Sequence, residues 1–311
     1  MDQQKVDILI SSSVWDPKPW VEGLSKSDLV GEIHVWPTKA DLTNVEVLFV
    51  WKPLAEGVID LLPNLKWISS LGAGVDHLMI DAQIPSDLPI TRIVDPFLAR
   101  DMTNYVVMGL MMHQRSMLSH LENQKSNTWE RITYQSLKVG VMGLGALGGH
   151  LAEKLVDLGF EVFGFSRTLK EIEGVKCFEA SGIKDFLGQA EVLVNLLPVT
   201  PQTTDILNKE VFEGLPKGAY LINVARGNHL VEQDLIDSLD QGHLSGALLD
   251  VFRTEPLPSD SALWRHPKVI ITPHVASVTT PKSAIELLLN NLSRLKTGKD
   301  LLHTVNINQG Y

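Results

Sequence analysis

Arginine, glutamate and histidine side chains follow separate apolar segments in the last third of the chain, at Arg226, Glu255 and His274. Each apolar segment predicts a buried strand, and the carboxyl ends of parallel strands meet at one edge of a sheet. We therefore expect these side chains to lie close together. A guanidinium can hold a carboxylate and polarise a carbonyl, an imidazole can donate a proton, and a carboxylate can orient the imidazole and raise its pKa. Reduction of a 2-oxo acid requires these groups, so Arg226, Glu255 and His274 are our candidate catalytic residues.

Each of these side chains also has an ordinary interpretation. A single arginine is usually a surface charge, and a glutamate before a proline, as at Glu255, is usually a loop acid. A histidine after Thr-Pro, as at His274, is more often structural. Their shared position after successive predicted strands favours the chemical interpretation.

A candidate substrate site follows a predicted strand in the first third of the chain. The backbone amides of Gly72, Ala73 and Gly74 can form a nest for the substrate carboxylate, which Arg226 and His274 would also contact. Trp51 ends another predicted strand. Its side chain either narrows the pocket towards two- and three-carbon acids or packs in the core.

The segment 139–148 reads V-G-V-M-G-L-G-A-L-G and predicts a strand, a tight turn and the start of a helix. In a dinucleotide site the first glycine allows the turn, the second lets the pyrophosphate approach, and the third lets helix and sheet pack closely. The alternative is a tight turn that binds no ligand. The candidate cofactor-binding residues here are Gly143, Gly145, Ala146, Leu147 and Gly148.

A second predicted strand, over 160–165, ends in Ser166 and Arg167, with Lys170 shortly after. NAD sites usually carry an acid at this place, which accepts from the ribose 2′-hydroxyl. A serine followed by an arginine suits the 2′-phosphate of NADP instead, so we predict that NADPH is preferred over NADH. The alternative for Arg167 is a solvated surface arginine.

These residues need a scaffold of parallel strands. Segments 6–10, 33–36, 45–51, 65–70 and 90–94 read as strands, with helical patterns over 19–29 and 54–62. A Met-rich segment over 101–121 predicts one long helix, either buried or dimer-forming. Further strands are expected at 192–196, 220–223, 246–249 and 269–271, and a last helix at 281–296, which we expect to return to the first domain.

The alternation of strands and helices predicts an α/β protein with two doubly wound parallel-sheet domains. We expect a flavodoxin-like substrate domain over 1–98 plus 281–311 and a Rossmann NAD(P)-binding domain over 99–280.

Composition narrows the class of protein. The 311 residues carry a net charge of −10, which argues against nucleic acid or an anionic membrane as the main partner. Cys177 is the single cysteine, which excludes an intrachain disulfide and fits a reducing compartment. With no secretion signal and no apolar span, we expect a cytoplasmic protein, and we expect no metal site.

Several segments together resemble the D-isomer-specific 2-hydroxyacid dehydrogenases, and most closely the glyoxylate and hydroxypyruvate reductases among them. The matching segments are Leu71–Asp76, Phe165–Arg167, Leu197–Thr203, Asn223–Gly227, Leu249–Leu257, Ile271–Ala276 and the Gly310-Tyr311 ending. The resemblance implies that Arg226 binds substrate, that Glu255 pairs with His274, and that His274 donates the proton. It also implies a homodimer formed through the nucleotide domains. The cofactor residues that it adds are Leu197, Pro198, Thr203, Val224, Ala225 and Asp250, the last facing the nicotinamide carboxamide.

The leading hypothesis is thus an NADPH-dependent enzyme that reduces glyoxylate to glycolate and hydroxypyruvate to D-glycerate. One alternative is a dehydrogenase of larger D-2-hydroxy acids on the same site. Another is a non-catalytic, nucleotide-sensing protein of the corepressor kind. The presence of Arg226, Glu255 and His274 argues against the second alternative.

Overall fold

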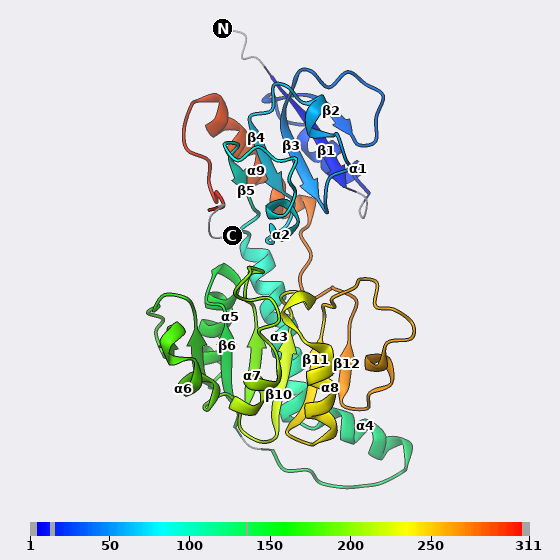
Figure 1. Ribbon diagram of the computed structural model, residues 1–311, viewed down its shortest axis with the longest axis vertical. Helices are drawn as coiled ribbons and strands as arrows, with labels where there is room; N and C mark the ends of the chain where they lie inside the picture. The colour runs from blue at the N-terminus through cyan, green and yellow to red at the C-terminus, as the bar shows by residue number, and fades with distance from the viewer. Residues whose placement is uncertain (1–4, 13–15, 135, 307–311) are drawn as a thin grey trace. The chain divides into compact units, whose positions relative to one another are not determined.

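The structure is a computed structural model that describes residues 5–12, 16–134 and 136–306. The chain divides into two compact units: unit 1 spans residues 1–97 and 278–311, and unit 2 spans residues 98–277. Each unit is built on a parallel sheet flanked by helices (Figure 1). The prediction of an α/β protein with two parallel sheets is confirmed.

In the described part of unit 1, the sheet has five parallel strands in the order β2-β1-β3-β4-β5, which is the flavodoxin-like order. The strands are β1 Val6–Ser12, β2 Val30–Val35, β3 Val45–Trp51, β4 Trp67–Ser70 and β5 Ile90–Thr91. The helices are α1 Lys18–Leu24, α2 Asp76–Met79 and α9 Pro281–Lys296. Helix α9 returns to unit 1 as the sequence predicts, and it packs tightly on α1, because a Cβ on Gly23 would lie 2.1 Å from Cδ1 of Ile285.

In the described part of unit 2, seven parallel strands follow the order β12-β11-β10-β9-β6-β7-β8. The chain starts in the middle at β6, runs to one edge, and then returns to build the other half, as in a Rossmann fold. The strands are β6 Lys138–Met142, β7 Glu161–Phe165, β8 Val175–Phe178, β9 Val192–Asn195, β10 Ala219–Asn223, β11 Leu244–Leu249 and β12 Val269–Ile271. The helices are α3 Pro96–Gln114, α4 Met117–Lys125, α5 Ala146–Asp157, α6 Ile183–Leu187, α7 Lys209–Gly214 and α8 Glu232–Asp240.

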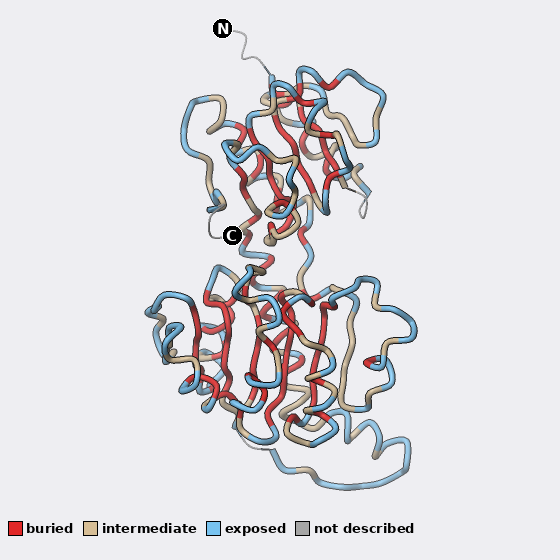
Figure 2. The backbone as a smooth tube through the Cα atoms, viewed as in Figure 1, coloured by how far each residue is buried: buried red, intermediate tan, exposed pale blue. Residues whose placement is uncertain are grey.

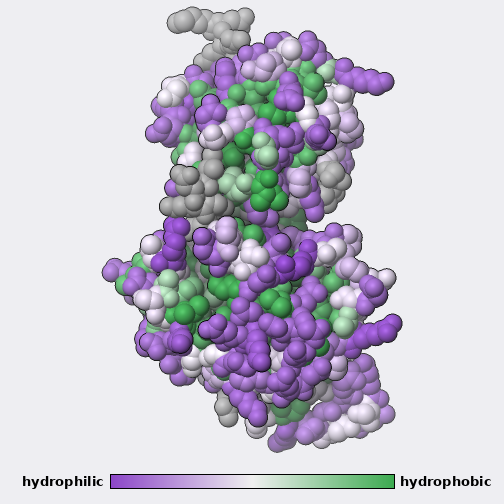
Figure 3. All heavy atoms as spheres, in the orientation of Figure 1, coloured by the Kyte–Doolittle hydropathy of each residue, from purple (hydrophilic) through white to green (hydrophobic). Residues whose placement is uncertain are grey.

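Helices cover both faces of the sheet in unit 2. On one face, α3 and α5 contribute Val106, Leu110 and Leu151 to a buried apolar cluster with the strands. On the other face, α6, α7 and α8 contribute a second cluster that includes Phe186 and Leu235. The strands are accordingly buried along most of their length (Figure 2), while α7 and α8 turn hydrophilic side chains outward (Figure 3). None of the helices in the described ranges is long and apolar enough to cross a membrane.

The helix predicted over 54–62 is wrong. The structure has a loop there, with only a short 3₁₀ turn at Ile59–Leu61. Leu54, Val58 and Leu62 are all buried, so their four-residue spacing covers the sheet and imitates a helical face. Gly57 between them has a φ of +78°, which a right-handed helix cannot accommodate.

The single long helix predicted over 101–121 is also wrong, because two helices, α3 and α4, occupy this region. Ser116 separates them in the left-handed conformation, with a φ of +51°. A left-handed residue ends the right-handed run and redirects the chain. The apolar periodicity of the sequence continues across Ser116, so the periodicity gave no sign that the helix breaks there.

Candidate active site

The loop between β6 and α5 holds the glycine pattern. Gly143 has a φ of +101°, and a Cβ on Gly148 would lie 1.9 Å from the carbonyl oxygen of Gly143. A Cβ on Gly145, by contrast, would meet no described atom within 4 Å, so this side of the turn is open. No described side chain caps α5, which leaves the first amides, at Ala146, Leu147 and Gly148, able to donate. An open turn at an uncapped helix N-terminus fits the pyrophosphate of a dinucleotide.

Ser166 follows β7 at the same edge of the sheet. It is buried, and its hydroxyl donates to the carbonyl oxygen of Thr168 at 2.8 Å. The hydroxyl therefore closes the turn that carries Arg167, and it would have to rotate before it could donate to a phosphate. Arg167 and Lys170 are both exposed on this side of the loop, where a bound anion could meet them.

A buried polar network holds the loops after β9 and β10. Asn195 and Asn223 end these neighbouring strands, and Nδ2 of Asn195 donates to Oδ1 of Asn223 at 3.0 Å. The same Nδ2 lies 3.0 Å from Nδ1 of His229, whose Nε2 lies 3.2 Å from the carbonyl oxygen of Pro198. No role was expected for Asn195 or His229 from the sequence. The available signal was an asparagine ending each of two apolar strands.

The remaining predicted cofactor residues lie on these two loops. Leu197, Val224 and Ala225 are buried, so the loops are anchored by their apolar side chains. The hydroxyl of Thr203 donates to the carbonyl oxygen of Pro198 at 2.6 Å and closes the first loop on itself. A ligand at this edge would thus meet a fixed backbone.

Arg226 extends from the second loop. Its NH1 donates to the carbonyl oxygen of Ala225 at 2.7 Å, which orients the guanidinium. A Cβ on the next residue, Gly227, would lie 1.8 Å from the carbonyl carbon of Phe252. The arginine loop therefore touches the backbone of the loop that carries Glu255.

The structure brings His274 and Glu255 together. Nδ1 of His274 lies 2.8 Å from Oε2 of Glu255, while Oε1 of Glu255 accepts from the backbone amide of Phe252 at 3.1 Å. The His274 and Glu255 side chains are 35% and 27% exposed, so a ligand can reach them. Because Nδ1 faces Glu255, Nε2 is the atom of His274 that can exchange a proton with a ligand.

Asp250 is a buried carboxylate that connects the end of β11 to the loop that carries His274. Its Oδ1 accepts from the hydroxyl of Thr272 at 2.6 Å and from the amide of Val275 at 2.8 Å, and its Oδ2 accepts from the amide of Ala276 at 2.9 Å. The carbonyl oxygen of Asp250 also accepts from the amide of His274 at 2.8 Å. These bonds hold His274 in a left-handed conformation, with a φ of +56°.

Tyr105, on α3, extends this network through a short hydrogen bond between its hydroxyl and that of Thr272. Burial raises the pKa of Tyr105 to about 12, and the charge of Asp250 acts in the same direction. The phenol is therefore protonated at neutral pH. Tyr105 was not expected at the site, because nothing in a helical segment marks which side chain reaches a strand end.

The predicted substrate residues of unit 1 lie at the carboxyl edge of its own sheet. Trp51 ends β3, and Gly72, Ala73 and Gly74 follow β4. The indole packs directly on the loop, because a Cβ on Gly72 would lie 1.9 Å from Cζ3 of Trp51. The hydroxyl of Ser70 donates to the carbonyl oxygen of Gly74 at 2.8 Å and closes the turn.

The geometry of unit 2 combines a dinucleotide-type loop, a guanidinium and a histidine–carboxylate pair at one sheet edge. A model of the NAD-binding domain of D-isomer specific 2-hydroxyacid dehydrogenases matches residues 107–276. The matched segment runs from α3 to the residues just after His274, so it contains the whole of this edge.

Solved structures resemble the full chain. A D-isomer specific 2-hydroxyacid dehydrogenase from Xanthobacter autotrophicus Py2, in complex with NADPH and MES, is 35% identical with a TM-score of 0.95, over 99% of this chain and 100% of that one. An NADPH-dependent glyoxylate/hydroxypyruvate reductase from Sinorhizobium meliloti, in complex with NADP and sulfate, is 34% identical with a TM-score of 0.94 over the same shares. A probable 2-hydroxyacid dehydrogenase from Rhizobium etli CFN 42, with NADP, HEPES and L(+)-tartaric acid, is 36% identical with a TM-score of 0.91 over the same shares.

Proposed function

Because the chain belongs to the D-isomer specific 2-hydroxyacid dehydrogenase family, an NAD(P)-dependent group of oxidoreductases, we propose that it is an NADPH-dependent reductase of small 2-oxo acids. Glyoxylate and hydroxypyruvate are its proposed substrates, and glycolate and D-glycerate its products. The observation that carries this proposal is the pair of His274 and Glu255, 2.8 Å apart on the sheet edge that also bears Arg226 and the glycine loop.

In this proposal each side chain has one task. Arg226 holds the substrate carboxylate and polarises the carbonyl that becomes the alcohol. His274 gives the proton on Nε2 to the carbonyl oxygen as negative charge develops there, and Glu255 stabilises the imidazolium before the transfer. When bound, NADPH supplies the hydride that the carbonyl carbon receives. Asp250 keeps the loop of His274 in place and has lone pairs left to accept from the nicotinamide carboxamide.

The proposed preference for NADPH rests on the loop after β7. Ser166 replaces the acid that would repel a 2′-phosphate, and the exposed Arg167 and Lys170 add positive charge. A hydrogen bond to a charged group contributes about 1.5–3 kcal/mol, so the preference in kcat/KM should be roughly 10- to 100-fold.

The cofactor proposal is tested with both nicotinamides and saturating glyoxylate. Arg167→Ala should lower kcat/KM for NADPH about 10-fold and leave NADH nearly unchanged, because only the phosphate loses a partner. Equal efficiency of the wild type with the two cofactors would show that Arg167 faces solvent when the cofactor binds.

We assign the substrate role to the domain over 1–98 plus 281–311 and the cofactor role to the domain over 99–280. The amides of Gly72, Ala73 and Gly74 are the proposed nest for the substrate carboxylate in the first of these. The turn closed by Ser70 supports this role, because it presents the loop at the carboxyl edge of the sheet, where parallel sheets bind ligands.

We also propose that two copies of the chain associate through unit 2. Helix α4 and the segment after it expose the apolar side chains of Met117, Leu118, Leu121, Trp129 and Tyr134. Trp129 is 96% exposed, and Figure 2 shows that most of this segment is exposed as well. Isolated water-exposed apolar residues are common, but several exposed apolar side chains on α4 and the segment after it favour a protein partner. Sedimentation equilibrium of the purified chain should give twice the mass of one chain.

One experiment tests the central proposal. Absorbance of NADPH at its nicotinamide band is followed after glyoxylate or hydroxypyruvate is added to the purified protein. Loss of absorbance with production of glycolate or D-glycerate is expected. Tight NADPH binding without turnover of any 2-oxo acid would favour a nucleotide sensor instead.

A further inference from the structure

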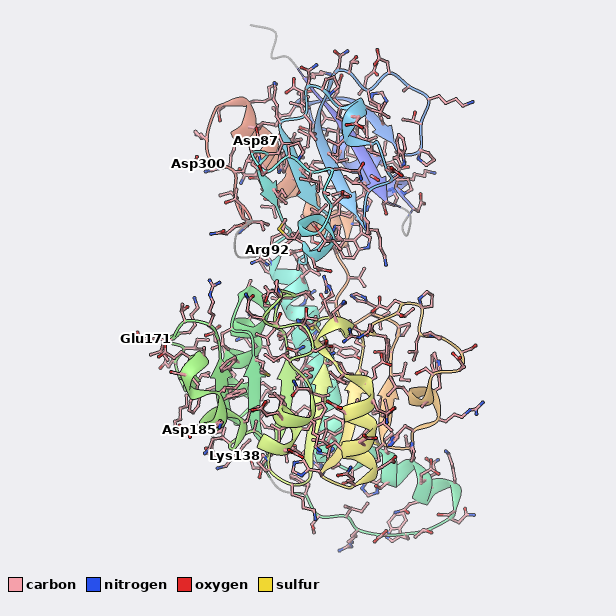
Figure 4. All side chains as sticks on the ribbon, viewed as in Figure 1. Asp87, Arg92, Lys138, Glu171, Asp185 and Asp300 are labelled. Carbon is pink, nitrogen blue, oxygen red and sulfur yellow. The ribbon has the colours of Figure 1, made fainter. Side chains whose placement is uncertain are left out.

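An arginine that the proposed reaction does not use lies beside the predicted carboxylate nest. Arg92 directly follows β5, and β5 pairs in parallel with β4, which leads into Gly72. The amide of Ile93 donates to the carbonyl oxygen of Gly72 at 2.9 Å, so the backbone around Arg92 is tied to the nest. Figure 4 shows Arg92 at the carboxyl edge of the sheet of unit 1, with Asp87 near the opposite edge.

The guanidinium of Arg92 is only weakly engaged. Its NH1 lies 3.5 Å from the carbonyl oxygen of Ala73, at the outer limit of a hydrogen bond. Within the described ranges, no carboxylate lies within ion-pair distance of it, and this contact is its one side-chain hydrogen bond. An arginine has five N–H donors, so most of them are left for a ligand.

Burial of the Arg92 guanidinium is energetically unfavourable when no ligand is bound to it. Arg92 is half-buried, and its burial lowers the pKa of the guanidinium below the usual value. A partly buried cation without a counter-ion is normally paired or hydrogen-bonded in a folded protein. The backbone amide of Arg92 donates to the carbonyl oxygen of His303 at 3.2 Å, and burial and the charge of Arg92 both lower the pKa of the His303 ring. An imidazole is neutral or cationic, so His303 supplies no counter-ion.

The strand order places this cation opposite an aromatic wall. The order β3-β4-β5 sets Trp51 on one side of the nest and Arg92 on the other. The indole closes its side, because it already contacts Gly72 at van der Waals distance. A substituent on a carboxylate bound in the nest would therefore meet a polar partner on the side of Arg92.

We propose that Arg92 is a specificity-determining residue that binds a hydroxyl or carboxylate at C3 of the substrate. The inference rests on the proposed function, in which the nest holds the carboxylate at C1. It selects 2-oxo acids with a polar C3 group, such as hydroxypyruvate or a 2-oxo dicarboxylate, over pyruvate, whose C3 is a methyl group. Glyoxylate has no C3 and makes no contact with Arg92.

The test compares four substrates in the wild type, in Arg92→Gln and in Arg92→Lys. Loss of a charged donor should lower kcat/KM for hydroxypyruvate and oxaloacetate about 10-fold or more in Arg92→Gln, chiefly through KM. Pyruvate and glyoxylate should change less than about 3-fold. The matched control is Arg294→Gln on α9, whose guanidinium donates to the carbonyl oxygen of Asp300.

A binding measurement accompanies the kinetics. With NADP present, tartronate, a hydroxy dicarboxylate, should raise the thermal unfolding midpoint of the wild type more than glycolate does, and Arg92→Gln should abolish that difference. Thermal unfolding without ligand shows whether each variant is folded. If Arg92→Gln does not fold, Arg92→Lys, which keeps the charge but not the planar fork, carries the same comparison.

Two outcomes would overturn the inference. An equal loss on all four substrates would make Arg92 an anchor of the C1 carboxylate or a support of the nest. No loss on any substrate would leave it with a structural role. Wild-type turnover of glyoxylate tests the proposed function separately, so failure of one proposal is distinguishable from failure of the other.

Discussion

The carboxyl edges of the two sheets are held in different ways. In unit 2 buried polar side chains stand at the strand ends: Asn195 and Asn223 end β9 and β10, and Asp250 follows β11. Each of them accepts a hydrogen bond from a loop amide. In unit 1 the buried hydroxyl of Ser70 also closes a loop, but the same edge presents Trp51 and Arg92, both half-buried. In the described ranges, the guanidinium of Arg92 makes one long hydrogen bond. A proton transfer requires atoms fixed to a fraction of an ångström, whereas recognition of a substituent tolerates adjustment. We therefore expect the edge of unit 2 to set the rate on every substrate and the edge of unit 1 to choose among substrates.

Arg226→Ala should have the largest effect. Loss of the charge that holds the carboxylate and polarises the carbonyl should cost at least about 3 kcal/mol, a factor above roughly 100 in kcat/KM, on all 2-oxo acids. Binding of NADPH, measured by calorimetry, should change little. If glyoxylate and hydroxypyruvate lost activity to very different extents, the division of roles between the two edges would be incorrect.

Glu255→Gln should come next, with a loss of roughly 10- to 100-fold in the rate of reduction near neutral pH. The amide keeps the size of the side chain but removes the charge that stabilises the imidazolium of His274, 2.8 Å away. Reduction needs the protonated ring, so it should begin to slow at a lower pH than in the wild type. A pH–rate profile measures this, and an unmoved profile would separate Glu255 from the proton transfer.

Tyr105→Phe tests whether the network behind His274 affects the rate. Loss of the hydrogen bond to Thr272 should cost about 0.5–1.5 kcal/mol, which is up to roughly 10-fold in kcat, with equal effects on all substrates. Since burial raises the pKa of Tyr105 to about 12, the hydroxyl is protonated throughout the range from about pH 6 to 9, and the ratio of variant to wild type should be constant there. A ratio that varied with pH in this range would exclude Tyr105 as a purely positioning residue.

Trp51→Ala should have the smallest effect on glyoxylate, within about 3-fold, because the reacting groups lie on unit 2. If the indole limits substrate size, 2-oxobutyrate should gain several-fold in kcat/KM, since one methylene in a pocket is worth about 1–3 kcal/mol. If the indole only packs against Gly72, thermal stability should fall and the substrate ranking should stay unchanged. The two results distinguish the interpretations that the sequence leaves open.

Much of the fold could be predicted from the sequence, because its strands are short apolar runs and a buried parallel strand requires such runs. The glycine loop was visible for a similar reason: the φ of +101° at Gly143 and the 1.9 Å approach at Gly148 both demand glycine. The helix over 54–62 was mispredicted because a loop that covers a sheet can bury residues at helical spacing.

The sequence alone therefore determined the elements, the strand ends and the polar side chains that follow them. The pairing of Glu255 with His274, across 19 positions of the chain, was expected from the sequence, and the structure gives its geometry. Only the tertiary structure decided that Tyr105 contacts Thr272, across 167 positions, and that the guanidinium of Arg92 makes one long hydrogen bond in the described ranges. Hydrophobic periodicity indicates which residues of a segment are buried. These contacts depend instead on the order of strands in the sheet, which brings distant strand ends together.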